Sequence, residues 1–258
     1  MKTFAMLLAA LALELAGRAP ARAAEPAPVV AAAADLSGAL PQVAAAFERQ
    51  SHRPVKLVFG SSGAFTQQIL AGAPFQLFLS ADEAYVARLA QAGRTEDPGA
   101  LYAVGRIGLF VPYGSRLKAD GSLKDLIAAS ADGRLRKFAI ANPEHAPYGR
   151  AAVQALQHAG AWSAVEGKLV LGENVAQATQ FAASGAAEGG VIPLSLALTP
   201  AVKAKGRFVL LPAEWHAPLR QRAALIKGAG PTARAFYAYL QGPQGRAILA
   251  RYGFSVPK

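Results

Sequence analysis

Residues 55–70 read VKLVFGSSGAFTQQIL. The segment 55–59 is mostly apolar, and from Phe65 onward the apolar residues recur at helical spacing. A strand followed by a helix is therefore predicted, with the turn GSSG at 60–63 between them. Glycine lets a backbone approach a ligand closely, and the first N–H groups of a helix have no partner within that helix. The turn is thus a candidate site for an anion.

Four further turns of the same kind lie at 33–37, 79–83, 141–149 and 172–175. Each follows a short apolar run and precedes apolar residues at helical spacing. Strands that alternate with helices predict a mostly parallel sheet covered on both faces. Ligands of such sheets bind outside the carboxyl ends of the strands, which is where these turns lie. We therefore expect several helix starts to face one small anion.

A second strand–helix series begins after the long extended run 102–111, and another extended run lies at 220–226. The chain has 258 residues, of which 53% are hydrophobic, enough for two lobes with cores of their own. We predict an α/β fold of two lobes with mixed sheets and a ligand cleft between them. The predicted lobes are 24–104 with 223–258, and 105–222, joined by crossovers near Val104 and Ala223.

Residues 1–23 have the composition of a cleavable signal peptide. Lys2 precedes an apolar stretch at 4–13 that is too short to span a bilayer, and Ala21-Arg22-Ala23 is a cleavage motif, with the cut after Ala23 or Ala24. The chain has no cysteine, which excludes disulfides, zinc–thiolate sites and a lipid-modified N-terminal cysteine. We expect a soluble monomer in the periplasm.

The formal net charge is +11, and +9 without residues 1–23, which carry three basic side chains and one acidic one. The basic residues are scattered, with one tight cluster at 134–137, and no predicted helix carries a basic stripe with interleaved aromatic residues. This pattern favours steering of small anions over nucleic-acid binding. The four histidines show no metal-ligand spacing and the chain has no Gly-x-Ser-x-Gly motif, so neither a metal nor an enzyme is predicted.

Two of the turns also have the residue spacing of helix caps. Ser80 and Glu83 have the spacing of a capping box, in which each side chain bonds the other residue's backbone N–H. Asn174 and Gln177 have the same spacing. Helix capping alone could therefore account for some of the polar residues in both turns.

In their order along the chain, these motifs resemble those of the periplasmic molybdate-binding proteins of ABC transporters, which have the type II periplasmic-binding-protein fold. The resemblance spans about residues 29–254, and is carried by AAADL at 32–36, FGSSG at 59–63, AGAP at 71–74, LFLSAD at 77–82, NPEHAPYG at 142–149, GENV at 172–175, FYAYL at 236–240 and GPQ at 242–244. It implies a binding protein without cofactor or catalytic residues. Its ligand would be a tetrahedral oxyanion, molybdate or tungstate, and its partner a membrane permease.

The resemblance also implies which residues contact the oxyanion. Carried over position by position, these are Asp35, Ser62, Ala81, Tyr148 and Val175. Ser62 and Tyr148 would donate hydroxyl hydrogens, and Ala81 and Val175 backbone N–H groups. Asp35 stands where many members of the family have serine.

Two positions depart from the family pattern. A tyrosine that the family has at the end of a later strand falls on Pro193, so Tyr148 is expected to take over its role. A carboxylate at Asp35 would repel a dianion. Either the side chain caps a helix or pairs with an arginine, or Asp35 accepts the proton of a phosphate-like oxyanion, or the ligand is different. From another class, a secreted hydrolase would use Asp35, Ser62 or His145.

Overall fold

The computed structural model of the protein describes residues 26–255. The predicted signal peptide 1–23 lies outside the described residues. The strands are β1 (Val29–Ala33), β2 (Lys56–Gly60), β3 (Leu77–Ser80), β4 (Ala100–Gly105), β5 (Ile107–Pro112), β6 (Phe138–Ala141), β7 (Leu169–Gly172), β8 (Gly189–Pro193), β9 (Gly206–Leu210) and β10 (Leu219–Leu225). The helices are η1 (Ala34–Leu36), α2 (Leu40–Ser51), α3 (Ser62–Leu70), α4 (Glu83–Gln91), α5 (Lys124–Ala131), α6 (Pro147–His158), α7 (Trp162–Val165), η2 (Glu166–Lys168), α8 (Val175–Ala183), α9 (Leu194–Ala197), α10 (Pro200–Lys203), η3 (Ala213–Trp215), α11 (Pro231–Gln241) and α12 (Pro243–Arg251).

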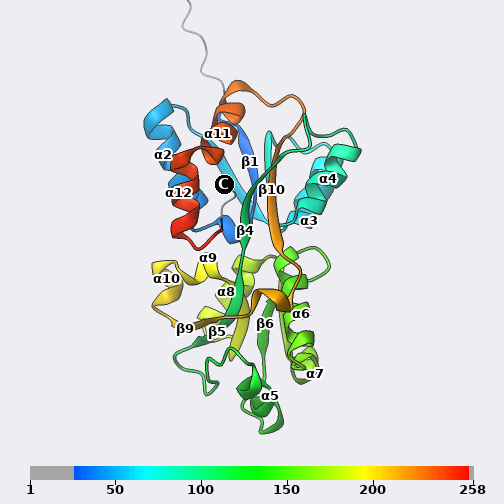
Figure 1. Cartoon of the computed structure of the whole chain (residues 1–258), viewed down its shortest axis with the longest axis vertical. Coiled ribbons are helices and arrows are strands. Elements are labelled where there is room, and N and C mark those ends of the chain that lie inside the picture. Colours follow the sequence, from blue (N-terminus) through cyan, green and yellow to red (C-terminus); the bar gives the residue numbers. More distant parts are fainter. Residues whose placement is uncertain (1–25, 256–258) are drawn as a thin grey trace, which may run out of the picture.

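The strands form two five-stranded sheets, one in each half of the molecule (Figure 1). The first has the order β2-β1-β3-β10-β4 and the second the order β7-β6-β8-β5-β9. In the first sheet β1 runs parallel to β2 and β3, whereas β10 is antiparallel to its neighbours. In the second, β6 is parallel to β7 and β8, and β5 is antiparallel to β8 and β9. Both sheets are mixed, as predicted.

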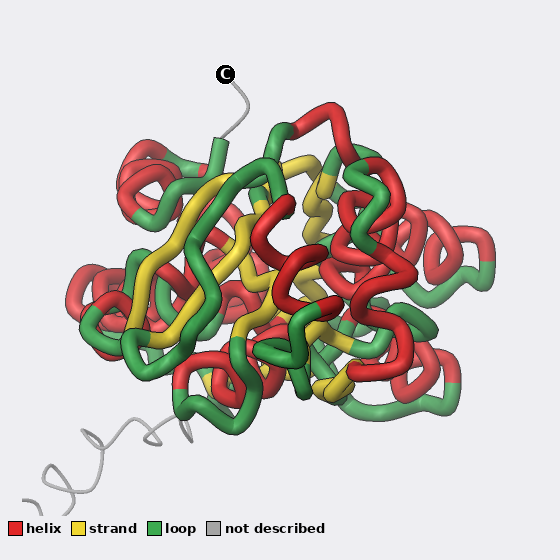
Figure 2. Tube along the Cα trace, turned by 90° about the horizontal axis from the view of Figure 1, so that it is seen from below, coloured by secondary structure: helices red, strands yellow, loops and turns green. Residues whose placement is uncertain are grey.

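Helices cover both faces of each sheet, with the strands at the centre and the helices around them (Figure 2). On one face of the first sheet, α2, α11 and α12 pack around the buried side chains of Leu40 and Phe236. On the other face, α3 and α4 bury Phe65 and Leu89 against Phe78. Fully burying one such side chain contributes about 1.5–3 kcal/mol to folding. These two apolar layers hold the carboxyl ends of β1, β2 and β3 in fixed positions.

Two crossovers join the halves, which we call lobe 1 (the first sheet and its helices) and lobe 2 (the second sheet and its helices). One is Arg106, between β4 and β5, and the other is the segment between β9 and β10. The predicted run 102–111 is thus divided between two sheets, and β10 begins at Leu219, so Ala223 lies inside a strand of lobe 1. The buried core of lobe 2 extends to Ala33 and Ala81 of lobe 1, so the lobes are in contact.

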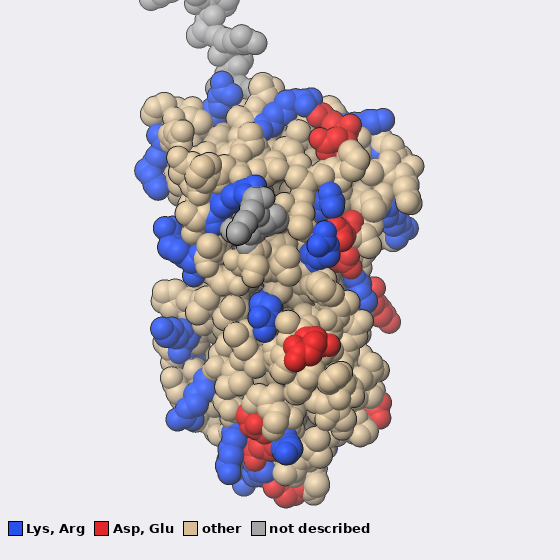
Figure 3. Space-filling model, viewed as in Figure 1, with Lys and Arg blue, Asp and Glu red and all other residues tan. Residues whose placement is uncertain are grey.

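Charges of both signs are interspersed over the face of the molecule in Figure 3, without one continuous basic surface there. Within residues 26–255, no helix has the length and apolar character needed to cross a bilayer. The same residues contain no group of three or more His, Asp or Glu side chains that could hold a metal ion.

Candidate functional site

The five residues predicted to contact a ligand line one small cavity between the lobes. Asp35, Ser62 and Ala81 come from lobe 1, and Tyr148 and Val175 come from lobe 2. The cavity volume is about 10 Å³, which suits about one water-sized group. All five residues are buried, and each lies at or directly after the carboxyl end of a strand or at the start of a helix. A group of several atoms therefore reaches this site only when the lobes move apart.

Ser62 is the first residue of α3 and has its side chain in the cavity lining. The N-cap residue Ser61 accepts a hydrogen bond from the N–H of Ala64 at 3.3 Å. Ser62 Oγ accepts one from the N–H of Ala81 at 2.9 Å. Because the oxygen of Ser62 is the acceptor here, its hydroxyl hydrogen is available to another group. Ala81 N–H, predicted as a ligand donor, instead orients the Ser62 hydroxyl in this structure.

Val175 is the first residue of α8, and its N–H has no acceptor within the helix. The N-cap Asn174 accepts hydrogen bonds from Ala176 and Gln177 through Oδ1, at 3.0 and 3.2 Å. This confirms Asn174 as the predicted cap. The Asn174 side chain therefore accepts from the second and third N–H groups of α8. The first N–H group, that of Val175, is not bonded by this cap.

The capping box predicted for Ser80 and Glu83 is wrong. Helix α4 begins at Glu83 with Asp82 as its N-cap, and Asp82 Oδ1 accepts from Ala84 N–H at 2.9 Å. Glu83 is ion-paired with two arginines of β10 instead, and these lower the pKa of its carboxyl. In place of the predicted capping box, Glu83 thus forms ion pairs between α4 and β10.

Asp35 is completely buried, and its two carboxyl oxygens have different surroundings. Oδ2 accepts hydrogen bonds from Tyr148 OH at 2.9 Å and from Gln221 Nε2 at 2.6 Å. Oδ1 has no hydrogen-bond partner among the described residues. Burial raises the pKa of this carboxyl to about 7, although the hydrogen bonds from Gln221 and Tyr148 and the interaction with its own backbone N–H act in the opposite direction. Among residues 26–255 no arginine pairs with Asp35, contrary to one of the alternatives that the sequence left open.

Gln221 and Tyr102 complete this network and were not predicted from the sequence. Gln221 Nε2 also donates to Tyr148 OH at 3.0 Å, and its Oε1 accepts from Tyr102 OH at 2.7 Å. Gln221 is fully buried in the middle of β10. One signal was present: Gln221 occupies the same alternate positions as the apolar residues Leu219 and Ala223, which places a polar side chain on the buried face of a strand.

His145 connects the lobes next to the cavity. The N–H of Gly63 donates to the carbonyl of His145 at 2.9 Å, and His145 Nδ1 lies 2.9 Å from Ser61 Oγ. This is the histidine–serine proximity that a hydrolase would need. However, the only carboxylate paired with His145 among the described residues is Glu173, at 3.6 Å, and the Glu173 side chain is 80% exposed. Ser61 Oγ is moreover the cap of α3, so the geometry fits a contact between lobes better than a catalytic triad.

Arg150 of α6 forms a second bridge between the lobes. Its guanidinium donates to Asp82 Oδ2 at 2.6 Å and to Tyr85 OH at 2.8 Å. The same group lies 5.4 Å from the centre of the Tyr85 ring, within the range of a cation–π contact. Both partners belong to lobe 1, so these contacts exist only while the lobes are together.

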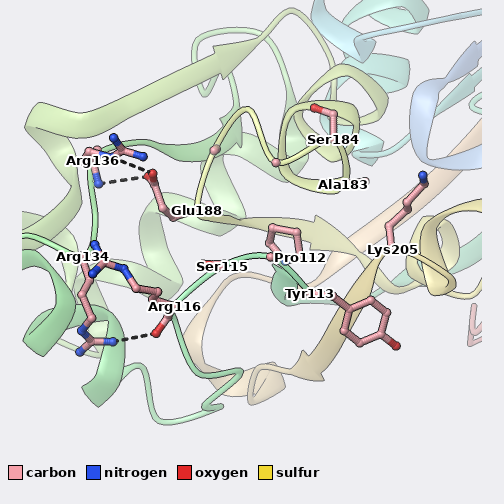
Figure 4. A pocket seen from close by; sticks show the side chains of 13 residues that line it. Pro112, Tyr113, Ser115, Arg116, Arg134, Arg136, Ala183, Ser184, Glu188 and Lys205 are labelled. Carbon is pink, nitrogen blue, oxygen red and sulfur yellow. Dashed lines mark hydrogen bonds and ion pairs between the residues drawn. The ribbon is translucent and has the colours of Figure 1, made fainter.

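A larger pocket of about 440 Å³ lies in lobe 2 away from these residues (Figure 4). It contains several basic side chains, but Arg134 is paired with Asp125 and Asp132, and Arg136 with Glu188. The carboxyl-terminal end of α8 also lines it, and the dipole there disfavours anions. This pocket is therefore less suited to an anion than the small cavity between the lobes.

Comparison with known proteins decides the family. The model of the family described as bacterial extracellular solute-binding protein matches residues 28–255. The chain belongs to this family. The molybdate-binding protein ModA of Azotobacter vinelandii is 35% identical over 230 residues, which cover 88% of this chain and 89% of that protein. ModA of Rhodobacter capsulatus is 34% identical over 249 residues, covering 95% of this chain and 94% of that protein.

The fold agrees with these sequence matches. The solved structure of the Azotobacter vinelandii periplasmic molybdate-binding protein superimposes with a TM-score of 0.79 at 32% identity, covering 90% of this chain and all of that chain. The predicted α/β two-lobe fold and the predicted resemblance to the molybdate-binding proteins are confirmed. The names of these relatives describe binding proteins rather than enzymes.

Proposed function

We propose that the protein is the periplasmic substrate-binding protein of an ABC importer and binds a tetrahedral oxyanion, molybdate or tungstate. The observation that carries this proposal is the convergence of Asp35, Ser62, Ala81, Tyr148 and Val175 on one buried cavity at the starts of α3, α6 and α8. Helix N-termini favour anions through free N–H groups and through their dipoles. The similarity to molybdate-binding proteins at more than 30% identity supports this ligand over other anions.

Binding uses neutral donors in place of the water shell of the ion. The Ser62 hydroxyl, oriented by the N–H of Ala81, donates to one ligand oxygen. The N–H of Val175 is a further donor that the resemblance implies. The other two, the N–H of Ala81 and the Tyr148 hydroxyl, donate to Ser62 Oγ and Asp35 Oδ2 in this structure and so act on the ligand through these residues. Hydrogen bonds to a charged group contribute about 1.5–3 kcal/mol each. A few such bonds in a dry cavity are sufficient for tight binding.

Closure of the lobes completes the site. Lobe 1 and lobe 2 each supply part of the cavity, so the ligand enters while they are apart and is enclosed as Gly63 and Arg150 approach the opposite lobe. The closed form then presents both lobes together to a membrane permease. No cofactor or nucleic acid has a role in this cycle, and the protein acts as a monomer.

A thermal-melting series tests the function directly. We expect molybdate and tungstate to raise the melting temperature, since a ligand at a hundredfold over its Kd stabilises by about 2.7 kcal/mol. Sulfate and phosphate at the same concentration serve as controls. A rise with phosphate in place of molybdate would support the second candidate, a protonated phosphate-like oxyanion, which the unpartnered Oδ1 of Asp35 favours. No rise with any of the four would contradict oxyanion binding.

Replacing Arg150 by glutamine should weaken molybdate binding about two- to fivefold. The Arg150–Asp82 pair is about one-third exposed on both sides, and such pairs contribute about 0.2–1 kcal/mol. Its loss lowers the population of the closed form and with it the apparent affinity. Isothermal titration calorimetry measures the change. Arg136→Gln is the matched control, because Arg136 forms an ion pair within lobe 2 only; an equal loss in both variants would assign the effect to net charge.

A further inference from the structure

The hydrogen bonds around Asp35 determine where a proton on this carboxyl must lie. Gln221 Nε2 has two hydrogens, one directed at Asp35 Oδ2 and one at Tyr148 OH. Tyr148 OH accepts one of them and donates its own hydrogen bond to Asp35 Oδ2. Tyr102 OH holds the amide in this orientation through Gln221 Oε1. Oδ2 therefore already accepts two hydrogens, and an added proton belongs on Oδ1, the oxygen without a partner.

An arriving oxyanion makes the ionised form of Asp35 costly. The helix starts at the cavity can stabilise one negative group, but a dianion would take their free N–H groups. An ionised Asp35 would then face two like charges inside a buried site without compensating donors. Within the described residues, no lysine or arginine contributes to the pKa of Asp35. A proton on Oδ1 removes this repulsion and converts the oxygen into a donor.

We propose that Asp35 binds the oxyanion as the neutral acid and donates its Oδ1 hydrogen to a ligand oxygen, so that binding is coupled to the uptake of a proton by this carboxyl. This inference rests on the proposed function and adds a coupling of binding to pH. Tyr148 then acts on the ligand through Asp35, since its hydroxyl stays on Oδ2. The carboxyl that departs from the family's serine thus supplies the hydroxyl hydrogen that a serine would supply.

The surroundings of Asp35 leave one group to titrate in the relevant range. The titratable side chains facing it are Tyr148 from α6 and Tyr102 from β4, and the pKa of each is raised well above 10 by burial and by the nearby carboxylate. Gln221 from β10 and Ser195 from α9, which donates to the Asp35 carbonyl at 2.7 Å, do not titrate. The pKa of Asp35 in the unliganded site is about 7. Below that pH Asp35 already carries the proton. Above it, Asp35 must take up a proton from solvent when the anion binds.

Calorimetric titration with sodium molybdate between about pH 6 and about pH 9 tests the proposal. We expect a nearly constant Kd below about pH 7 and a rise approaching tenfold per unit above it. Titrations at about pH 8 in two buffers of different ionisation enthalpy should show close to one proton taken up per anion. Binding with a constant Kd and no proton uptake would overturn the inference and leave the proposed function intact. Absence of molybdate binding at every pH would overturn both.

Substitution of Asp35 assigns the proton to this residue. Asp35→Asn keeps an acceptor toward Tyr148 and Gln221 and places an amide donor where Oδ1–H would be. We expect this variant to bind molybdate with no proton uptake and with the steep rise of Kd abolished. Asp132→Asn, a change of an exposed carboxylate in lobe 2, should keep the wild-type slope. A folded Asp35→Asn protein that retains the slope, or that fails to bind at any pH, would overturn the inference.

Gln221→Leu gives a second test if the asparagine variant does not fold. The hydrogen bond from Gln221 lowers the pKa of Asp35, so its loss should raise this pKa further. The rise of Kd should then begin at a higher pH than in the wild type. An unchanged onset would overturn the inference, because it would place the titrating proton on a group that Gln221 does not contact.

Discussion

Replacing Asp35 by asparagine should raise the stability of the unliganded protein at about pH 8 by up to about 4 kcal/mol. The carboxyl is completely buried, and its pKa rises from 3.8 to about 7 mainly because burial disfavours the charged form. Folding at alkaline pH therefore forces a carboxylate into a site that favours the neutral acid. Asparagine has a similar shape and can keep the bonds from Tyr148 and Gln221 without the charge.

The sign of this effect depends on pH. Below the unfolded pKa of 3.8 the carboxyl is protonated in both states, so its contribution is fully present. Between 3.8 and about 7 the unfolded chain loses the proton first, and stability falls as pH rises. Above about 7 both states are ionised and the loss is complete. The advantage of the asparagine variant should thus grow from about pH 4 to about pH 7 and then level off.

Melting curves of wild type and Asp35→Asn without ligand, recorded across this pH range, measure the effect. Asp132→Asn is the control of opposite sign, because hydrogen bonds from Arg134 lower the pKa of the exposed Asp132 carboxyl. The stability of Asp132→Asn relative to the wild type should therefore not increase as the pH rises. A constant difference between wild type and Asp35→Asn from acid to alkaline pH would contradict the raised pKa of Asp35.

A residue that destabilises the unliganded fold at neutral pH is unusual in a buried position. Natural proteins retain such groups chiefly where function depends on them. Asp35 lines the cavity, carries an unpartnered oxygen and connects lobe 1 to lobe 2 through Tyr148 and Ser195. These three features together are the reason to assign it a role in ligand binding rather than in packing.

Local patterns were sufficient to predict most of the strands. The predicted strand 55–59 is β2 at Lys56–Gly60, and the apolar run predicted before the turn at 79–83 is β3 at Leu77–Ser80. The run 102–111 was harder to interpret, because apolar residues continue through the point where the chain passes from one lobe to the other. Only Arg106 interrupts it, and the sheet to which each half belongs depends on pairing with distant strands.

The residues that line the cavity could be predicted from the sequence, whereas the hydrogen-bond network of Asp35, Tyr148 and Gln221 could not. All five predicted residues line it, because each lies in a turn whose position follows from strand–helix alternation. Their contact with a ligand stays a prediction. Gln221 was not predicted, because its partners Asp35 and Tyr148 are 186 and 73 residues away in sequence. Contacts between lobes, such as that of Gly63 with His145, likewise depend on how the two lobes close rather than on any local motif.

Gly63 lies at a close contact between the two lobes beside the site. Its N–H bonds the carbonyl of His145, and a Cβ built on Gly63 would lie 2.7 Å from that carbonyl oxygen and 2.9 Å from His145 Cβ. Both distances are well inside normal contact, and a backbone carbonyl cannot move aside as a side chain can. The closed form therefore tolerates only glycine here, whereas the open form has no such restriction.

Gly63→Ala should weaken molybdate binding by about five- to 150-fold, since overpacking at such a contact costs about 1–3 kcal/mol. The unliganded protein should be as stable as the wild type or slightly more so, because alanine is favoured over glycine in a helix by about 1 kcal/mol. Calorimetric titration and melting curves separate the two effects. Gly167→Ala, where a Cβ would meet nothing within 4 Å, should change neither. Wild-type affinity in Gly63→Ala would show that tight binding does not require the lobes to close as far as they do in this structure.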